Sequence, residues 1–458
     1  MSVIEHQAER VGKYQPYPEY NNSGYSWMAK IPSGWLNGPL KRIAYLQAGF
    51  AFKGDTFNTS EGVPIVRMNN ILNSGGLSLD DAVRVPEIDV KPEFYLATGD
   101  IVMGMSGSIE NIAKVQGDDL PCALNQRVGR FVLRAVDDGF LWYLIQSNGF
   151  KQQVSLAATG TAQLNISSDQ VGNTLVSWPV SLLEQNIIAA FLDYETARID
   201  RLIAKQQRLI ELLKEKRQAL ISHAVTKGLN PNTPMKDSGV EWLGQVPEHW
   251  NVTKFGFISN VVRGGSPRPA GDPELFDGDY SPWVTVAEIT KDEEVYLEST
   301  ESFLTEKGSK QSRVFKRGTL LLSNSGATLG VPKILSIDAN ANDGVVGFEK
   351  LSVNTEYAYF YLSTLTDNLR ERIKQGSGQP NLNTDIVKSI VIPLPPSGEV
   401  EAILSEIKTH RITFSVLISK ADTAIKLMQE RRTALISAAV TGKIDLRGWT
   451  QPAEEVAA

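Results

Sequence analysis

The chain lacks the features typical of membrane, disulfide-bonded or metal-cluster proteins. Cys122 is the only cysteine, which excludes an internal disulfide and a zinc site built from cysteines, since both need at least two thiols. No apolar run approaches the roughly 20 residues of a membrane span. The polar start, residues 1–13, has no apolar core of a signal peptide. We therefore expect a cytoplasmic protein that does not contact a membrane.

Positive charge is scarce for a protein that would bind nucleic acid by itself. The 458 residues carry 46 Lys and Arg against 52 Asp and Glu, which gives a formal net charge of -6. Neutralisation of phosphates by basic side chains supplies most non-specific DNA affinity. If DNA is the ligand of this chain, we expect basic partners to contribute to the binding.

Motifs of catalysis are also missing. The sequence has no P-loop, and its Gly376–Gly378 run stops short of a dinucleotide-binding fingerprint. The four histidines are scattered, and none stands near another His or Cys at ligand spacing. The Asn-Pro-Asn-Thr segment 230–233 is not the Asn-Pro-Pro-aromatic loop of an adenine methyltransferase. We expect no catalytic residue, no metal site and no cofactor in this chain.

A duplication is present instead. The segment from Ser23 to Trp35 matches Ser238 to Trp250, and Arg217 to Thr226 matches Arg432 to Thr441, each at an offset of 215 residues. Between these ends the offset drifts to 218 and 219, so the middles diverge and contain small insertions. Fixed ends around divergent middles predict a common scaffold with two different recognition surfaces. Free drift within a purely structural duplication is the alternative.

Short apolar runs between turn residues predict strands in both middles. The expected strands are 64–66, 100–105 and 130–133 in the first copy, and 282–286, 320–322 and 345–348 in the second. A long helix is predicted after each middle, at about 182–225 and 399–440. Each copy is therefore expected to consist of a mixed α/β domain followed by a long helix.

Apolar residues recur every seven positions along both long helices, which indicates a coiled-coil seam. The seam comprises Leu192, Ile199, Gln206, Leu213 and Leu220 in the first helix, with Leu202 and Leu209 three positions after Ile199 and Gln206, and Ile407, Phe414, Ala421, Met428 and Leu435 in the second. About 40 helical residues form a rod of roughly 60 Å, too long to be buried in one small domain. We expect the two helices to pair antiparallel about a pseudo-two-fold axis.

The segment from Asp237 to Trp250, which reads DSGVEWLG and then VPEHW, resembles the opening motif of specificity subunits (HsdS) of type I restriction-modification systems. Gly99–Val102, the Gly376–Asn383 segment and Ile392–Pro396 are further similarities, so the resemblance spans nearly the whole chain. Trp178–Val180 departs from the family's usual Pro-Leu-Pro-Pro run, which affects only the details of a domain boundary.

The resemblance implies an α+β fold with two mixed α/β target-recognition domains separated by a pair of long antiparallel coiled-coil helices, with an internal pseudo-two-fold repeat. The implied segments are an N-terminal conserved segment 1–35, target-recognition domain 1 at 36–180, a central long helix 181–226, a linker with the repeated Trp motif 227–250, target-recognition domain 2 at 251–398, a C-terminal long helix 399–441 and a tail 442–458.

The resemblance also implies a non-catalytic protein that reads a split double-stranded DNA site, with the paired helices setting the gap between the half-sites. The implied partners are two methyltransferase (modification) subunits and restriction/translocase subunits. Those partners would carry S-adenosylmethionine, ATP and Mg. Because the two middles differ, the two half-sites should differ, and the target should be asymmetric.

Base reading favours Arg, Lys, Asn and Gln on loops, because these side chains make paired hydrogen bonds to base edges. The candidate DNA contacts are Lys53, Arg67, Asn69, Asn70, Gln126 and Arg127 in the first domain and Arg263, Arg268, Lys291, Lys310, Arg313 and Asn324 in the second.

Some polar and aromatic residues recur in both copies, and different targets should not need identical readers. Recurrence therefore favours a shared structural role for Gln163, Asn165, Gln379 and Asn383, and scaffold anchoring for Trp27, Trp35, Trp242 and Trp250. Two other functions stay open at this stage. One is a coiled-coil scaffold that binds other proteins, which the acidic net charge would suit, and the other is an enzyme with an unrecognised site.

Overall fold

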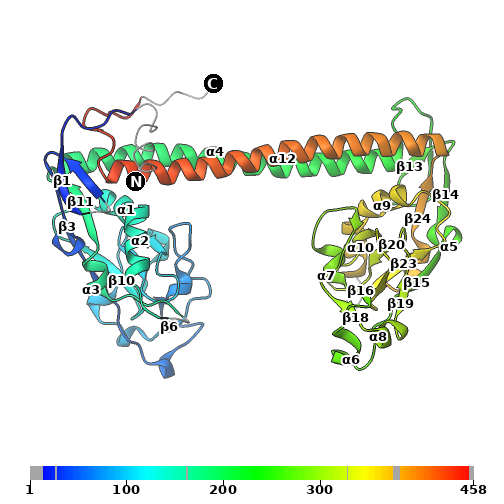
Figure 1. Cartoon of the computed structure of the whole chain (residues 1–458), viewed down its shortest axis with the longest axis horizontal. Helices are drawn as coiled ribbons and strands as arrows, with labels where there is room; N and C mark the ends of the chain where they lie inside the picture. Colours follow the sequence, from blue (N-terminus) through cyan, green and yellow to red (C-terminus); the bar gives the residue numbers. More distant parts are fainter. Residues whose placement is uncertain (1–13, 26–27, 161–162, 327, 375–381, 453–458) are drawn as a thin grey trace. The chain divides into compact units, whose positions relative to one another are not determined.

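The computed structural model describes residues 14–25, 28–160, 163–326, 328–374 and 382–452, and the chain divides into two compact units (Figure 1). Unit 1 comprises Met1–Gln206 and Thr423–Ala458, and unit 2 comprises Gln207–Asp422. Each unit therefore combines one mixed domain with a part of each of two long helices.

Unit 1 combines short strands with short helices. Its strands are β1 (Tyr20–Tyr25), β2 (Met28–Pro32), β3 (Trp35–Pro39), β4 (Ala44–Ala48), β5 (Val63–Val66), β6 (Arg84–Val85), β7 (Ile101–Gly104), β8 (Ile112–Lys114), β9 (Ala123–Leu124), β10 (Val128–Leu133) and β11 (Leu175–Pro179), and its short helices are α1 (Asp138–Gln146), α2 (Asn148–Ala157) and α3 (Ser168–Gly172). We call the part from β3 to β11 head 1.

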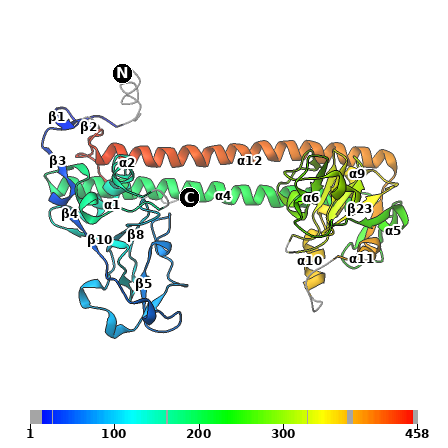
Figure 2. The ribbon, with the colours of Figure 1, turned by 60° about the horizontal axis from the view of Figure 1, so that its bottom comes forward.

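Two small sheets form head 1. One is antiparallel with the order β4-β10-β7-β8, and the other has the order β6-β5-β9, in which β5 and β9 are parallel. All residues of β7 are buried, as expected for an apolar run with a paired strand on each side. Figure 2 shows α1 and α2 beside the long helices and β5 on the far side of head 1.

Unit 2 repeats this plan with additional elements. Its strands are β12 (Met235–Asp237), β13 (Gln245–Pro247), β14 (Asn251–Lys254), β15 (Asn260–Arg263), β16 (Ser281–Val284), β17 (Tyr296–Leu297), β18 (Phe303–Leu304), β19 (Arg313–Phe315), β20 (Leu320–Ser323), β21 (Pro332–Leu335), β22 (Ala339–Ala341), β23 (Val345–Glu349) and β24 (Val391–Leu394). Its short helices are α5 (Phe255–Ile258), α6 (Pro273–Phe276), α7 (Val286–Thr290), α8 (Glu306–Lys310), α9 (Thr355–Ser363), α10 (Thr366–Lys374) and α11 (Thr384–Ser389). We call the part from β14 to β24 head 2.

Head 2 has the same sheet topology as head 1. Its sheets have the orders β15-β23-β20-β21-β17 and β18-β16-β22-β19, and β16 and β22 are parallel. The first four strands of one sheet correspond to β4-β10-β7-β8, and β18-β16-β22 correspond to β6-β5-β9. β17 and β19 are additional strands, and the short helices α6 to α8 stand where head 1 has single turns of 3-10 helix, at Gly54–Thr56, Met68–Asn70 and Glu87–Asp89. Both heads are thus the mixed α/β domains that the sequence predicts, and the insertions fall in the divergent middle.

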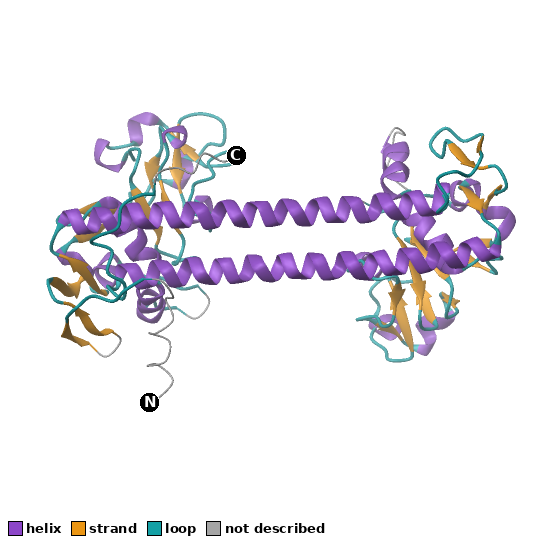
Figure 3. Cartoon of the chain, turned by 90° about the horizontal axis from the view of Figure 1, so that it is seen from above, coloured by secondary structure: helices purple, strands orange, loops and turns teal. Residues whose placement is uncertain are grey.

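Two long helices follow the heads at the predicted places, α4 (Leu182–Lys227) and α12 (Ser397–Val440). In unit 1 the start of α4 packs on the end of α12, where Leu192 and Leu435 share one core. In unit 2 the end of α4 packs on the start of α12, through Ile221 and Ile407. Within each unit the two helices therefore run antiparallel, as expected (Figure 3).

The buried face of the long helices differs in one respect from the predicted coiled-coil seam. Of the predicted seam residues, Leu192, Ile199, Ile407, Phe414 and Leu435 are buried, and Leu213, Leu220 and Met428 are half-buried. Leu202 and Leu209, however, are 42% and 43% exposed, so their placement beside the seam is wrong. The half-buried Ile203 and Ile210, one residue further on, take that place.

Each long helix is anchored at its start by a tryptophan and a glutamate. Trp35 Nε1 donates to Glu184 Oε1 (2.8 Å), and Trp250 Nε1 donates to Glu399 Oε2 (2.9 Å). Both indoles are buried, which confirms the scaffold role expected for these two tryptophans. Trp242 is half-buried against the core of unit 2, and Trp27 lies outside the described residues.

Candidate nucleic-acid interface

An equivalent turn follows the parallel strand pair of each head. In head 1, β5 and β9 pair in parallel, and the turn Asn125–Arg127 leads from β9 to β10. In head 2, β16 and β22 pair in parallel, and the turn Asn342–Gly344 leads from β22 to β23. We call these turn 1 and turn 2. Both close with the same backbone hydrogen bond, in which Val128 N donates to Asn125 O (2.9 Å) and Val345 N to Asn342 O (3.2 Å).

A glycine lets a neighbouring segment pass close to each turn. Gly49 N donates to Val128 O (3.1 Å), and Gly264 N donates to Val345 O (2.9 Å). A Cβ atom at either glycine would lie 2.2 Å from the carbonyl oxygen of the first residue of the turn. Only glycine permits this approach, so the two glycines, 215 residues apart, mark structurally equivalent positions.

A third segment supports each turn from the loop after the central strand. Met105 N donates to Arg127 O, and Asn324 N donates to Gly344 O, both at 2.9 Å. The carbonyls of Met105 and Asn324 in turn accept from Ile166 N (3.0 Å) and Leu382 N (2.7 Å). Each turn is therefore held by backbone bonds on two sides, and its exposed side chains project from a rigid frame.

These bonds correct the register of the repeat near its end. Ile166 corresponds to Leu382, so the N-cap residue Ser167 of α3 corresponds to the N-cap residue Asn383 of α11. Asn383 therefore does not correspond to Asn165, as the recurrence suggested. Its side chain accepts from Ile386 N at 2.8 Å, a helix-capping role that it shares with Ser167 and not with Asn165. Gln379 lies outside the described residues.

Most of the candidates in head 1 lie on the surface around turn 1. Arg67 and Asn69 directly follow β5, Gln126 and Arg127 belong to the turn, and Lys53 follows the segment that passes at Gly49; all five residues are exposed. Arg127 Nη1 donates to Ser106 Oγ (3.1 Å) and to Asn165 Oδ1 (3.3 Å). Within the described part of the chain, neither Lys53 nor Arg67 forms an ion pair.

Asn70 is a correction. The side chain was predicted to contact DNA, but the residue is only 4% exposed. Asn70 Oδ1 accepts from Arg67 N (2.9 Å), and Nδ2 donates to Ser78 O (2.9 Å). The amide is thus used to fold the loop after β5, and no face of it is available to a base.

The candidates in head 2 partly gather around turn 2. Arg263 Nε donates to the carbonyl of Asp343 (2.5 Å), and Arg268 Nη2 lies 3.9 Å from Asp343 Oδ2. Arg313 lies beside the same strand end, because it pairs in register with Ala341. Asn324 also lies here, with Nδ2 donating to Asp343 O at 3.4 Å, but it is fully buried. Burial of this side chain speaks against its predicted contact with a base.

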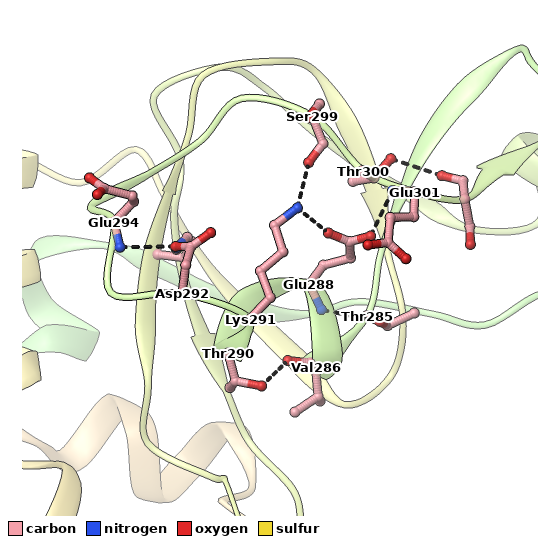
Figure 4. Close-up of polar contacts among 12 residues, drawn as sticks. Thr285, Val286, Glu288, Thr290, Lys291, Asp292, Glu294, Ser299, Thr300 and Glu301 are labelled. Atoms are coloured by element: carbon pink, nitrogen blue, oxygen red, sulfur yellow. Dashed lines mark hydrogen bonds and ion pairs between the residues drawn. The ribbon is translucent and has the colours of Figure 1, made fainter. Parts of the chain in front are cut away.

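Most basic candidates of head 2 are paired with carboxylates. Arg313 contacts Glu349 (3.2 Å), and Lys310 contacts Glu306 on its own helix (2.8 Å). Lys291, just after α7, donates to the buried Glu288 (2.8 Å), and this hydrogen bond raises the pKa of the lysine (Figure 4). Lys291 directly follows α7 and Lys310 ends α8, so neither belongs to turn 2 itself.

Sequence reasoning missed Asp343, the central residue of turn 2. The search for base-reading residues considered Arg, Lys, Asn and Gln, so an acidic residue did not qualify. A signal was present: Asn-Gln-Arg-Val at 125–128 and Asn-Asp-Gly-Val at 342–345 share the first residue of the turn and the valine that follows the turn. This match would have placed Gln126 and Asp343 at one position.

The described residues contain neither of two further features, a metal-binding cluster and a membrane-spanning helix. Among the described residues there is no group of three or more His, Cys, Asp or Glu that could hold a metal ion. Among the helices of the described part of the chain, none is long and apolar enough to cross a membrane.

Comparison with protein families identifies two matches within the chain. A model of the type I restriction modification DNA specificity domain matches residues 32–212 and 247–421. Together they cover well over half of the chain, and each includes one head with part of the long helix that follows it. The resemblance noted in the sequence is confirmed.

Known relatives carry the same description. The chain is 25% identical over 442 residues to the EcoKI specificity subunit of Escherichia coli strain K12, covering 91% of this chain and 90% of that relative. It is 31% identical over 209 residues to the MjaVIII specificity subunit of Methanocaldococcus jannaschii, covering 43% of this chain and 48% of that protein.

Solved structures share the fold. A chain from a type I R-M system, determined to explain complex assembly and conformational transition, matches with a TM-score of 0.68 at 16% identity, covering 91% of this chain and 100% of that chain. The HsdS subunit of Thermoanaerobacter tengcongensis matches with a TM-score of 0.50 at 16% identity, covering 91% and 98%. At this level of identity the likeness concerns the fold alone.

Proposed function

Because the chain belongs to the family of type I restriction modification DNA specificity domains, we propose that it reads an asymmetric, two-part DNA site, with one head on each half-site. The observation that carries this proposal is the repeated turn. Turn 1 and turn 2 have equivalent frames, yet the exposed side chains on them differ. An equivalent frame with different side chains is what two different half-sites require.

The exposed basic and amide residues are the proposed contacts to DNA. In head 1 these are Lys53, Arg67, Asn69, Gln126 and Arg127, and in head 2 they are Arg263, Arg268, Lys291, Lys310 and Arg313. Arg and Lys contact phosphates or guanine, and Asn and Gln suit adenine. The two buried amides are left out of this proposal.

The proposed partners follow from the family and from the charge. A chain with a net charge of -6 gains little non-specific affinity from phosphate contacts alone. We assign the missing affinity to two methyltransferase subunits, and the motor and cleavage steps to restriction/translocase subunits. S-adenosylmethionine, ATP and Mg belong to those partners in this proposal, and the chain itself makes and breaks no bond. The complex would act in the cytoplasm, where the genome lies.

Whole-genome mapping of methylated adenine tests the proposal. Cells would express the chain with its neighbouring methyltransferase, beside cells in which residues 36–180 are replaced by the equivalent segment of another family member. The ends of this segment suit a swap, because β3 and β11 pair with each other, with Leu36 opposite Trp178. We expect a split motif of which one half changes and the other half stays.

A reciprocal swap provides the matched control. Residues 251–394 also begin and end on a strand pair, with Asn251 of β14 opposite Leu394 of β24. This swap should change only the other half of the motif. If methylation in the wild type does not depend on the chain, the proposal fails, and a scaffold that binds other proteins becomes the better explanation.

A further inference from the structure

Asp343 lies in the middle of turn 2, and both its backbone amide and its carbonyl are hydrogen-bonded. Its carbonyl accepts from Arg263 Nε (2.5 Å) and Asn324 Nδ2 (3.4 Å), and its amide donates to Ser266 Oγ (3.4 Å). The side chain is nevertheless 47% exposed. A residue fixed by so many bonds but open to solvent presents one defined geometry to a ligand.

The two carboxylate oxygens of Asp343 differ in their surroundings. Oδ1 accepts from Ser266 Oγ at 2.7 Å, which fixes the rotamer. Oδ2 faces Arg268 Nη2 at 3.9 Å, which is an ion pair but is beyond hydrogen-bond distance. One oxygen is therefore used to orient the group, and the other remains able to accept a hydrogen bond from an incoming donor.

In a complex with DNA, a carboxylate in this place costs free energy unless the DNA offers it a hydrogen-bond donor. Arg263 and Arg268 flank the turn and would attract the phosphates of DNA, whereas Asp343 repels them. A buried or crowded acid opposite a base acceptor would be left without a partner, at a cost typical of unsatisfied polar groups. An acidic residue between two arginines therefore acts mainly by rejecting sites that offer no donor.

The bases differ in what they offer in the major groove. Guanine and thymine present acceptors there, whereas cytosine presents its N4 amino group. Adenine places its N6 amino group beside the acceptor N7, which suits a side chain with both a donor and an acceptor. An aspartate thus fits cytosine, and a glutamine, the residue at this position in turn 1, fits adenine.

We propose that the second residue of the turn selects one base pair in each half-site: Asp343 accepts a hydrogen bond from a cytosine amino group, and Gln126 binds the edge of an adenine. This inference rests on the proposed function, because it presupposes that the heads read DNA. Beyond the proposed function, it names one residue in each head that carries selectivity, and it names the base that this residue selects.

Mapping of methylated adenine with Asp343→Asn tests the inference. The change keeps the size of the side chain and an oxygen for Ser266, but it replaces the open acceptor by an amide. We expect the wild-type motif to contain a C·G pair in the half read by head 2, and discrimination at that one position to fall by about tenfold or more in the variant. All other positions should stay unchanged.

Asp385→Asn is the matched control. Asp385 is also in unit 2, its side chain is 87% exposed, and the substitution removes the same charge without touching the turn. The motif should be unchanged. Gln126→Asp is the second variant, and it should shift one position of the other half-site from adenine towards cytosine. If Asp343→Asn abolishes methylation, so that no motif can be mapped, Gln126→Asp tests the inference.

The outcomes separate the inference from the proposed function. A chain-dependent split motif that is unaltered by both Asp343→Asn and Gln126→Asp overturns the inference and leaves the proposed function standing. A wild-type motif without a C·G pair in the half changed by the 251–394 swap also overturns it. Absence of any chain-dependent methylation removes the proposed function, and the inference with it.

Discussion

The two heads have equivalent frames but differ in how their positive charge is arranged. Around turn 1, Lys53 and Arg67 form no ion pair within the described residues, and Arg127 binds neutral oxygens. In head 2, Arg313 and Arg268 each face a carboxylate. An arginine that already has an acid beside it gains less from a phosphate, because the acid repels that phosphate. The two heads can therefore attract the phosphates of DNA to different degrees, although their backbones are equivalent.

The contacts that anchor the start of each long helix differ much less between the two units. In both units a buried tryptophan donates to a glutamate on the first turns of the long helix. The third partner differs: Tyr17 donates to Glu184 (2.7 Å), whereas His249 contacts Glu399 (2.6 Å). The side chains of the two units thus differ mainly at the turns, whereas the Trp–Glu contacts at the starts of the long helices are the same. Substitutions at both places test how far the two units are equivalent.

The largest effect is expected from removing the buried anchors. Trp250→Ala deletes a fully buried indole from the core of unit 2, and Trp35→Ala deletes one that is 5% exposed in unit 1. Each should lower the free energy of unfolding of its unit by about 3–5 kcal/mol, the usual cost of such a truncation. Denaturant unfolding of the purified chain measures this. If the anchors are equivalent, the two losses should agree within about 1 kcal/mol.

Phe257→Ala is the control for this pair. Phe257 is a large aromatic residue of head 2, but it is 82% exposed, so its removal should leave the unfolding transition almost unchanged. Cys122 gives an independent measure for unit 1. Burial, with a smaller contribution from Asp119 and Asp100, raises the pKa of this thiol to about 12. Thiol labelling at pH 8 should therefore accelerate in Trp35→Ala more than in Trp250→Ala; equal acceleration would contradict separate anchoring.

The charge difference between the heads predicts opposite effects of two substitutions on DNA binding by the assembled complex. Arg67→Ala removes an unpaired cation near turn 1, and it should weaken binding several-fold and reduce the salt dependence by about one phosphate contact. Glu349→Gln releases Arg313 from its carboxylate, and it should strengthen binding and steepen the salt dependence by up to the same amount. Affinities measured over a range of salt concentrations give both quantities.

Glu401→Gln serves as the control for charge alone. Glu401 is exposed on α12, so its neutralisation adds the same charge to the chain without releasing a cation near the turn. Binding should change little. An increase as large as that of Glu349→Gln would mean that net charge, and not the pairing of Arg313, governs affinity.

Much of the fold was predictable because it depends on patterns that the sequence repeats. The six expected strands fall on β5, β7, β10, β16, β20 and β23, and both long helices lie where the heptad pattern placed them. The seam was wrong at Leu202 and Leu209, each of which precedes an isoleucine. Adjacent apolar residues on a helix differ by about 100° in direction, and only the partner helix decides which one faces the seam.

The candidate site was less predictable, because polarity does not reveal what a side chain contacts. Asn70 and Asn69 are neighbours of the same type, yet one folds the loop and the other is exposed. Asparagine often bonds to nearby backbone, so its presence on a loop predicts a turn as well as a contact. Asp343 was missed because only Arg, Lys, Asn and Gln counted as base-reading residues, although the Asn and Val that the two segments share mark its position in the sequence.

The smallest predicted effect concerns the acid stability of the anchor in unit 2. Burial by itself raises the pKa of Glu399, but hydrogen bonds from Trp250 and His249 outweigh it and hold the pKa below the ordinary 4.5. A lowered carboxyl pKa contributes stability that is complete above the ordinary value and is lost as pH falls through the lowered one. The side chain is 43% exposed, so the contribution should stay below about 1 kcal/mol.

Unfolding of unit 2 measured between pH 6 and pH 3 should therefore lose a small part of its pH dependence in Glu399→Gln. Glu248→Gln, on an exposed residue next to His249, should keep the wild-type profile. A profile in which Glu399→Gln and the wild type coincide at every pH would show that the hydrogen bonds from Trp250 and His249 to this carboxylate contribute no pH-dependent stability.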